Sequence, residues 1–171
     1  LLQTVADALK LLTKEDIIPG NADKFLFMLA PFIIFIGAFI GFVALPFGDE
    51  VLIADLNIGI FYILAVGSLG VIGLILAGWS SNNKWSLYGG MRSAAQIVSY
   101  EIPAGLSIVV VIMMTGTLSM QDIIEYQAGG IQHWILFANP FAFLAFFIYF
   151  ISVVAETNRT PFDIPEAESE L

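Results

Sequence analysis

The chain has 171 residues, of which 58% are hydrophobic and only 12% are charged, and its mean hydropathy is +0.89. Soluble domains carry about 25% charged residues, so this composition is too poor in charge for a surface that faces only water. Six Lys and Arg against fifteen Asp and Glu give a net charge of -9, which excludes a basic nucleic-acid-binding protein. The chain has no Cys and a single His, His133, so it cannot by itself hold a disulfide, an iron–sulfur cluster or a thiolate zinc site.

Residues 1–18 are expected to form an amphipathic helix that ends at Pro19. Helical spacing places apolar and polar side chains on opposite faces, with Leu1, Val5, Leu9 and Leu12 against Gln3, Asp7, Lys10 and Lys14. Such a helix lies at a membrane interface or packs beside membrane spans. The simpler explanation of its polar face is a surface exposed to water.

Four long segments nearly free of charge follow, at 25–47, 57–79, 94–116 and 134–155, and only the third contains a charged residue, Glu101. A bilayer core about 30 Å thick needs about 20 helical residues, and each segment exceeds that length. The expected fold is therefore all-α, a polytopic membrane helix bundle of four transmembrane helices plus the N-terminal amphipathic helix. Pro31 and Pro103 are expected to kink or interrupt their helices.

The cations predict the orientation of this bundle. All six lie before the first span, between spans two and three, or after span four, and the connecting segments 48–56 and 117–133 contain no Lys or Arg. The positive-inside rule then places both ends of the sequence on the cytoplasmic side. Because the sequence begins with Leu and stops just after an acidic stretch, we expect a fragment of a longer membrane chain.

Glu101 is the first candidate for chemistry, since it lies within the third apolar segment, which is expected to start two turns before it. An ionised carboxylate in such a place costs about 3 kcal/mol, and burial favours its protonated form. A nearby Arg92 would oppose that preference. The residue is a candidate for proton relay, with a structural hydrogen bond to a neighbouring helix as the alternative.

The segment 156–171 is the second candidate, an acidic cytoplasmic loop with one cation, Arg159. It contains five carboxylates: Glu156, Asp163, Glu166, Glu168 and Glu170. An ordinary solvated acidic loop is the competing explanation. No phosphate-binding, dinucleotide-binding or nucleophile-elbow motif occurs anywhere in the sequence.

Four stretches resemble one family in order along the chain. Ala155–Leu171 (AETNRTPFDIPEAESEL) is the most specific, and Gly78–Pro103, Leu2–Pro19 and Ala54–Tyr62 also match. They resemble the H subunit of respiratory complex I, which is the quinone-site membrane component of the bacterial proton-pumping NADH:quinone oxidoreductase. The family chain has about eight spans, and the four expected here are similar to its spans two to five.

The resemblance implies a subunit that helps wall a quinone chamber and couples quinone reduction to proton translocation. Quinone is then a substrate and no cofactor is bound by this chain alone, because NADH, flavin and iron–sulfur clusters belong to partner subunits. The implied partners are the cluster-bearing peripheral-arm subunits, small membrane subunits and the bilayer. The implied location is a bacterial plasma membrane rather than a mitochondrial inner membrane.

The family also assigns residues, again as implied by resemblance, with no catalytic residue and no metal ligand among them. The proton path would include Glu101, Glu156, Asp163, Glu166 and Glu168, and the quinone chamber and loop would include Arg159, Arg92 and Lys10. The clustered carboxylates should titrate as a coupled group, so that quinone reduction nearby changes their protonation.

Other classes of function remain open from the sequence. A homologous membrane subunit of a hydrogenase or formate hydrogenlyase complex would differ only in its partners. An ion transporter with Glu101 as its ion site should show paired broken spans, and none is evident in the sequence. A structural or assembly membrane protein would leave Glu101 and the acidic loop without a role.

Overall fold

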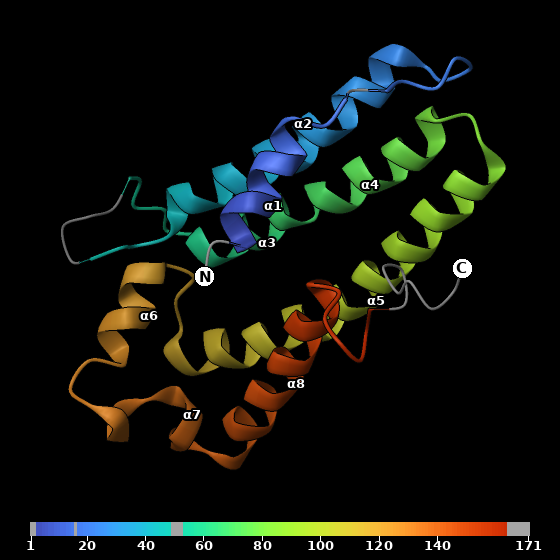
Figure 1. Ribbon diagram of the computed structural model, residues 1–171. Helices are drawn as coiled ribbons and strands as arrows, with labels where there is room; N and C mark the ends of the chain where they lie inside the picture. The colour runs from blue at the N-terminus through green and yellow to red at the C-terminus, as the bar shows by residue number, and fades with distance from the viewer. Residues whose placement is uncertain (1–2, 16, 49–52, 164–171) are drawn as a thin grey trace.

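The computed structural model of the chain describes residues 3–15, 17–48 and 53–163, and every regular element in these ranges is a helix (Figure 1). The all-α prediction is therefore confirmed. Leu1, Glu166, Glu168 and Glu170 lie outside the described residues. The elements in chain order are α1 (Gln3–Leu12), α2 (Lys24–Gly41), η1 (Phe42–Ala44), α3 (Gly59–Gly67), α4 (Leu69–Ser80), α5 (Lys84–Thr115), α6 (Met120–Tyr126), η2 (Ile131–His133), α7 (Ile135–Ala138) and α8 (Pro140–Glu156).

Four helices pack as a row in which α4 lies against α2, α5 against α4, and α8 against α5 (Figure 1). Glycines bring the first three together. A Cβ on Gly73 would come 3.1 Å from the carbonyl oxygen of Ala30 on α2, and one on Gly90 would come 3.3 Å from the Cα of Gly78. Helices in membranes associate through such small residues because lipid offers no hydrophobic drive between them.

Three stretches are long and apolar enough to cross a membrane: Lys24–Ala44, Gly59–Ser80 and Lys84–Thr115. Only 11 to 17% of each apolar window is buried within the chain. Large apolar side chains therefore cover the outside of these helices, as expected where lipid or other helices replace water.

The fourth apolar segment differs from the expectation. The prediction of one helix over 134–155 is wrong, because the chain breaks at Asn139, whose backbone is extended at φ -157° and ψ 162°. The residue before a proline avoids the helical region, and Pro140 begins α8 while the Asn139 Oδ1 accepts a 2.7 Å bond from the Ala142 N–H. Helix α8 has 17 residues, fewer than the about 20 that span a bilayer core. A fourth span stays a prediction.

Helix α5 also differs from its predicted range of 94–116. It begins at Lys84, where the Asn83 Oδ1 accepts a 3.0 Å bond from the Trp85 N–H, and it continues through Pro103 to Thr115. Polar residues in its first turns hide this start from a search for apolar runs. Neither Pro31 nor Pro103 interrupts its helix, and Figure 1 shows α5 changing direction as it passes from α4 toward α8.

The N-terminal helix is shorter than the predicted 1–18. Helix α1 ends at Leu12. The Thr13 hydroxyl donates a 2.9 Å bond back to the Leu9 carbonyl, and such local side-chain bonds compete with the backbone bonds that would continue the helix. No residue of α1 is buried, and Leu12 is 82% exposed. Lys10 lies on this helix, exposed to solvent.

Candidate functional site between α5 and α8

Helix α8 ends in a compact turn that sets the direction of the following loop. Asn158 has a left-handed backbone with φ 50°. Its N–H donates to the Ala155 carbonyl at 3.2 Å, and the Arg159 N–H donates to the Val154 carbonyl at 3.1 Å. This pair of bonds is the Schellman arrangement, in which a left-handed residue satisfies the last carbonyls of a helix. Asn is one of the few residues besides Gly that adopts this backbone readily.

A second turn follows at once, closed by a 2.7 Å bond from the Phe162 N–H to the Arg159 carbonyl. Within it the Thr160 hydroxyl donates to the Asp163 Oδ2 at 3.3 Å. Arg159 is exposed and Asp163 is half-buried. The start of the loop, residues 157–163, is therefore a folded unit rather than an extended strand of charges.

Gln96 on α5 holds this unit from the side. Its Nε2 lies 3.2 Å from the Ala155 carbonyl oxygen, 3.2 Å from the Asn158 Oδ1 and 2.7 Å from the Phe162 carbonyl oxygen. One turn further along α5, the Tyr100 ring packs against the Phe162 ring with centroids 5.1 Å apart.

Glu101 and Glu156 approach each other from α5 and α8. Glu101 is half-buried, one turn before the buried Ala104, whereas Glu156 is the exposed last residue of α8, just past the predicted span 134–155. Partial desolvation beside the packed helices raises the pKa of the Glu156 carboxyl above its ordinary value, and the Glu101 carboxylate raises it further. The Glu156 carboxyl therefore keeps its proton to a higher pH than an ordinary Glu does.

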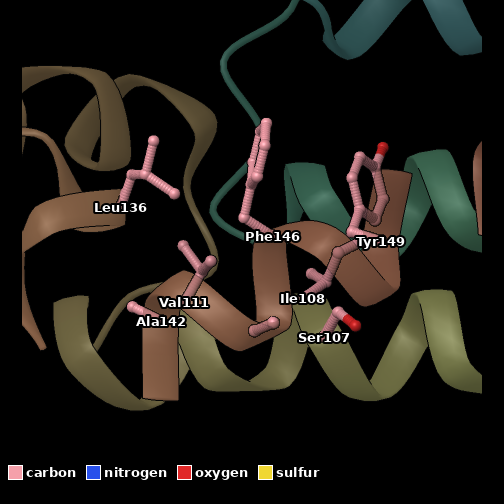
Figure 2. Close-up of a pocket in the computed structure, with 8 residues that line it drawn as sticks. Ser107, Ile108, Val111, Leu136, Ala142, Phe146 and Tyr149 are labelled. Atoms are coloured by element: carbon pink, nitrogen blue, oxygen red, sulfur yellow. The ribbon is translucent and has the colours of Figure 1, made fainter. Parts of the chain in front are cut away.

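An apolar cavity of about 160 Å³ lies between the same two helices (Figure 2). It is lined by Ser107, Ile108, Val111, Leu136, Ala142, Ala145, Phe146 and Tyr149. Figure 2 shows the hydroxyl-bearing Ser107 and Tyr149 at one end and Leu136 at the other. Seven residues separate Tyr149 from Glu156, which puts both on one face of α8 about 10 Å apart along the axis. The acid pair therefore lies about 10 Å beyond the polar end of the cavity.

Of the residues that the family resemblance selects, Glu101 lies on α5, Glu156 ends α8, and Arg159 and Asp163 lie in the folded turns that Gln96 holds. The other two described candidates are Arg92 and Lys10. Arg92 lies nine residues before Glu101 on α5, a spacing of half a turn beyond two full turns, so the two side chains leave opposite faces. Arg92 lies four residues before Gln96, on the face of α5 that Gln96 and Tyr100 turn toward the loop, and its nearness to Glu101 stays a prediction.

Lys10 belongs to α1, apart from the contacts between α5 and α8 described above. Sequence reasoning missed Gln96 and Tyr100, although their spacing of four residues places them on one helix face. Among the described residues, no cluster of His, Asp or Glu could hold a metal ion.

Three long apolar helices with exposed hydrophobic sides define a membrane-embedded helical protein. The chain belongs to the NADH dehydrogenase family, whose pattern it matches over residues 1–171, and the resemblance drawn from the sequence is confirmed.

Curated relatives agree with this family assignment. The NADH-quinone oxidoreductase H subunit of Chlorobaculum tepidum is 61% identical over 173 residues, covering 100% of this chain and 48% of the relative. The corresponding protein of Anaeromyxobacter dehalogenans is 59% identical over 169 residues, covering 99% and 41%. That of Rickettsia rickettsii is 55% identical over 172 residues, covering 100% and 49%. The chain spans about half the length of these relatives.

Proposed function

We propose that this chain is part of the membrane subunit of a NADH:quinone oxidoreductase, where it helps form the quinone chamber and couples quinone reduction to proton translocation. The observation that carries the proposal is the Glu101–Glu156 pair, which lies beside a folded acidic loop and about 10 Å beyond the polar end of an apolar cavity. The relatives named as the H subunit of NADH-quinone oxidoreductase support the choice of reaction.

The contribution to a quinone chamber rests on the α5–α8 interface. Its cavity is apolar apart from two hydroxyls, which suits the ring and isoprenoid chain of a quinone better than a charged metabolite. A volume of about 160 Å³ is too small for a whole quinone, so these residues would supply one wall and other parts of the enzyme the rest. Arg159, Arg92 and Lys10 would contribute cations near the loop and chamber.

Coupling to protons would pass through the acids. Since burial and the Glu101 carboxylate both raise the pKa of Glu156, Glu156 would hold a proton more readily than an ordinary carboxyl does. Asp163, Glu166 and Glu168 would extend this group along the loop. A change of charge at the quinone would then move a proton from the loop acids toward Glu101.

The electrons would come from partner subunits. Flavin and iron–sulfur clusters on a peripheral arm would carry electrons from NADH, and this chain would bind no redox cofactor of its own. The enzyme would lie in a bacterial plasma membrane, with four spans in this region and both ends of the sequence on the cytoplasmic side.

The test uses Glu101→Gln and Glu156→Gln in the full-length subunit within the assembled enzyme. Each variant removes one carboxylate while keeping size and hydrogen-bonding capacity. We expect quinone reduction by NADH and proton translocation to fall at least tenfold, since a single group that transfers a proton typically contributes about 10²- to 10⁴-fold. Glu125→Gln is the matched control, because Glu125 is exposed on α6. Full activity with full translocation in both site variants would refute the proposal.

A further inference from the structure

We infer that Gln96 is a positioning residue that holds the first turns of the acidic loop against α5 and so sets where Asp163 lies relative to Glu101. This inference rests on the proposed function, because it assigns a task to the same loop. Gln96 carries no charge and takes no part in moving a proton. Its effect would reach the acids only through the loop.

The geometry around the Gln96 amide nitrogen is the main support. Its three acceptors come from different parts of the turn: the Ala155 carbonyl at the end of α8, the Asn158 side chain and the Phe162 carbonyl. An amide NH₂ has two hydrogens, so three oxygens surround two donors. The position of the Gln96 Nε2 therefore requires a hydrogen-bond donor, because an acceptor there would lie close to three other acceptor oxygens.

Gln96 adds donors to groups at the end of α8 and in the turn beyond it. The carbonyl of the fully buried Ala155 also accepts from the Asn158 N–H at 3.2 Å, so Gln96 supplies a further donor there. The bond to the Phe162 carbonyl is short, at 2.7 Å. Losing a hydrogen bond of this kind costs about 0.5 to 1.5 kcal/mol, so removal of the amide should loosen the turn.

A second contact on the same face of α5 makes this a two-point attachment. The Tyr100 ring meets the Phe162 ring, while Gln96 holds the Phe162 backbone. Asp163 follows Phe162 directly and is tied back to Thr160. Glu101 follows Tyr100 directly on α5. Fixing Phe162 therefore restrains the backbone of Asp163 beside the turn of α5 that carries Glu101.

The experiment measures loop order and activity together in the assembled enzyme. Hydrogen exchange, read by mass spectrometry on peptides covering 155–163, should be about tenfold faster in Gln96→Leu, the change expected for losing one well-placed hydrogen bond. Quinone reduction should fall, while reduction of a water-soluble acceptor by the NADH-binding partner subunits should stay at the wild-type rate.

Gln96→Glu adds a test through pH dependence. A purely structural role of Gln96 elsewhere in the protein would not make activity and exchange depend on pH in this way. The ionised carboxylate repels the three oxygens, whereas the protonated form regains one donor. Activity and slow exchange should therefore return as the pH falls from about 8 to about 6. Gln96→Asn keeps the amide on a shorter stem and should show an intermediate effect, which covers the case that Gln96→Leu does not assemble.

The matched control is Gln127→Leu. Gln127 also bonds backbone groups, donating to the Ile123 carbonyl and accepting from the Ile135 N–H, but it lies just past α6 rather than beside the acidic loop. Its removal should leave exchange in 155–163 unchanged. Unchanged exchange in Gln96→Leu would overturn the positioning role. Faster exchange with wild-type quinone reduction and proton translocation would support that role and instead refute the function proposed for the loop.

Discussion

The ring of Tyr100 on α5 meets the ring of Phe162 beyond the end of α8 at a centroid distance of 5.1 Å and an interplanar angle of 62°. This edge-to-face contact joins a helix in the middle of the sequence to the loop that carries the acids. Aromatic pairs of this geometry contribute about 0.5 to 1.5 kcal/mol beyond their burial. The loop is thus held by packing as well as by hydrogen bonds.

Tyr100→Phe and Tyr100→Ala should separate the ring from its hydroxyl. Since the contact uses the ring, Tyr100→Phe should leave the loop as ordered as in the wild type. Tyr100→Ala should lower the local opening free energy of residues 155–163 by about 1 kcal/mol. Hydrogen exchange in the assembled enzyme measures this difference. A double-mutant cycle with Phe162→Ala checks it, because additive effects would show that the rings are not coupled.

Asn158→Ala and Asn158→Gly should have different effects on the end of α8. Alanine is strained at φ 50°, at a cost of about 1 to 2 kcal/mol, whereas glycine accepts that backbone and loses only the bond from Gln96 to the Asn158 Oδ1. The alanine variant should therefore exchange faster at Arg159 than the glycine variant. Equal rates in the two variants would show that the left-handed turn does not hold the loop.

The contact between α4 and α5 should be sensitive to one added methyl group. A Cβ on Gly78 would lie 3.0 Å from the Ser86 carbonyl oxygen and 3.4 Å from the Gly90 Cα. Gly78→Ala should lower the stability of the subunit by about 1 to 3 kcal/mol, the usual cost of overpacking. Gly89→Ala is the matched control, because nothing lies within 4 Å of its Cβ position. Thermal unfolding of the purified full-length subunit in detergent compares them, and equal midpoints would contradict the close approach.

The raised pKa of Glu156 gives a pH dependence with a definite sign. Below its ordinary pKa the carboxyl is protonated in both folded and unfolded states and changes nothing. As the pH rises through the ordinary value toward the raised folded value, the unfolded state loses its proton first and folding stability falls. Above the raised value the penalty is fully present.

Glu156→Gln should therefore be at least as stable as the wild type near pH 8, with the difference shrinking toward pH 5. Thermal unfolding midpoints of the full-length subunit across this range measure the trend. Glu101→Gln should reduce the same difference, because it removes the second cause of the shift. A wild-type protein that gains stability relative to Glu156→Gln with rising pH would contradict the assigned direction.

Most of the helical fold could be predicted from the sequence, since long apolar runs leave few alternatives to helices in a membrane. The break at Asn139 was predictable in principle from Asn followed by Pro, a start signal for a helix, but the continuous apolar run concealed it. The early start of α5 was missed because Lys84, Ser86 and Arg92 interrupt the apolar pattern without interrupting the helix.

The candidate site was harder to predict. The acids stood out by type, but the Gln96 partners lie 59 to 66 positions away in sequence, and no local pattern in one sequence encodes such a contact. Arg92 shows what the helical repeat adds to the sequence. It leaves α5 on the side opposite Glu101 but shares a face with Gln96, four residues further on.

The length of α5 has a consequence for the lipid around it. Its 32 residues extend about 48 Å at 1.5 Å per residue, against a hydrocarbon layer of about 30 Å. The surplus must be absorbed by tilt or by turns that emerge among the headgroups. Where the polar first turns of α5 lie among the headgroups, the hydrocarbon layer begins near Gln96, with Tyr100 one turn further on. Bilayer thickness would then affect the contacts that hold the loop against α5. Reconstitution in lipids of shorter and longer acyl chains, with exchange in 155–163 as the readout, would reveal an enzyme whose coupling is tuned by its membrane.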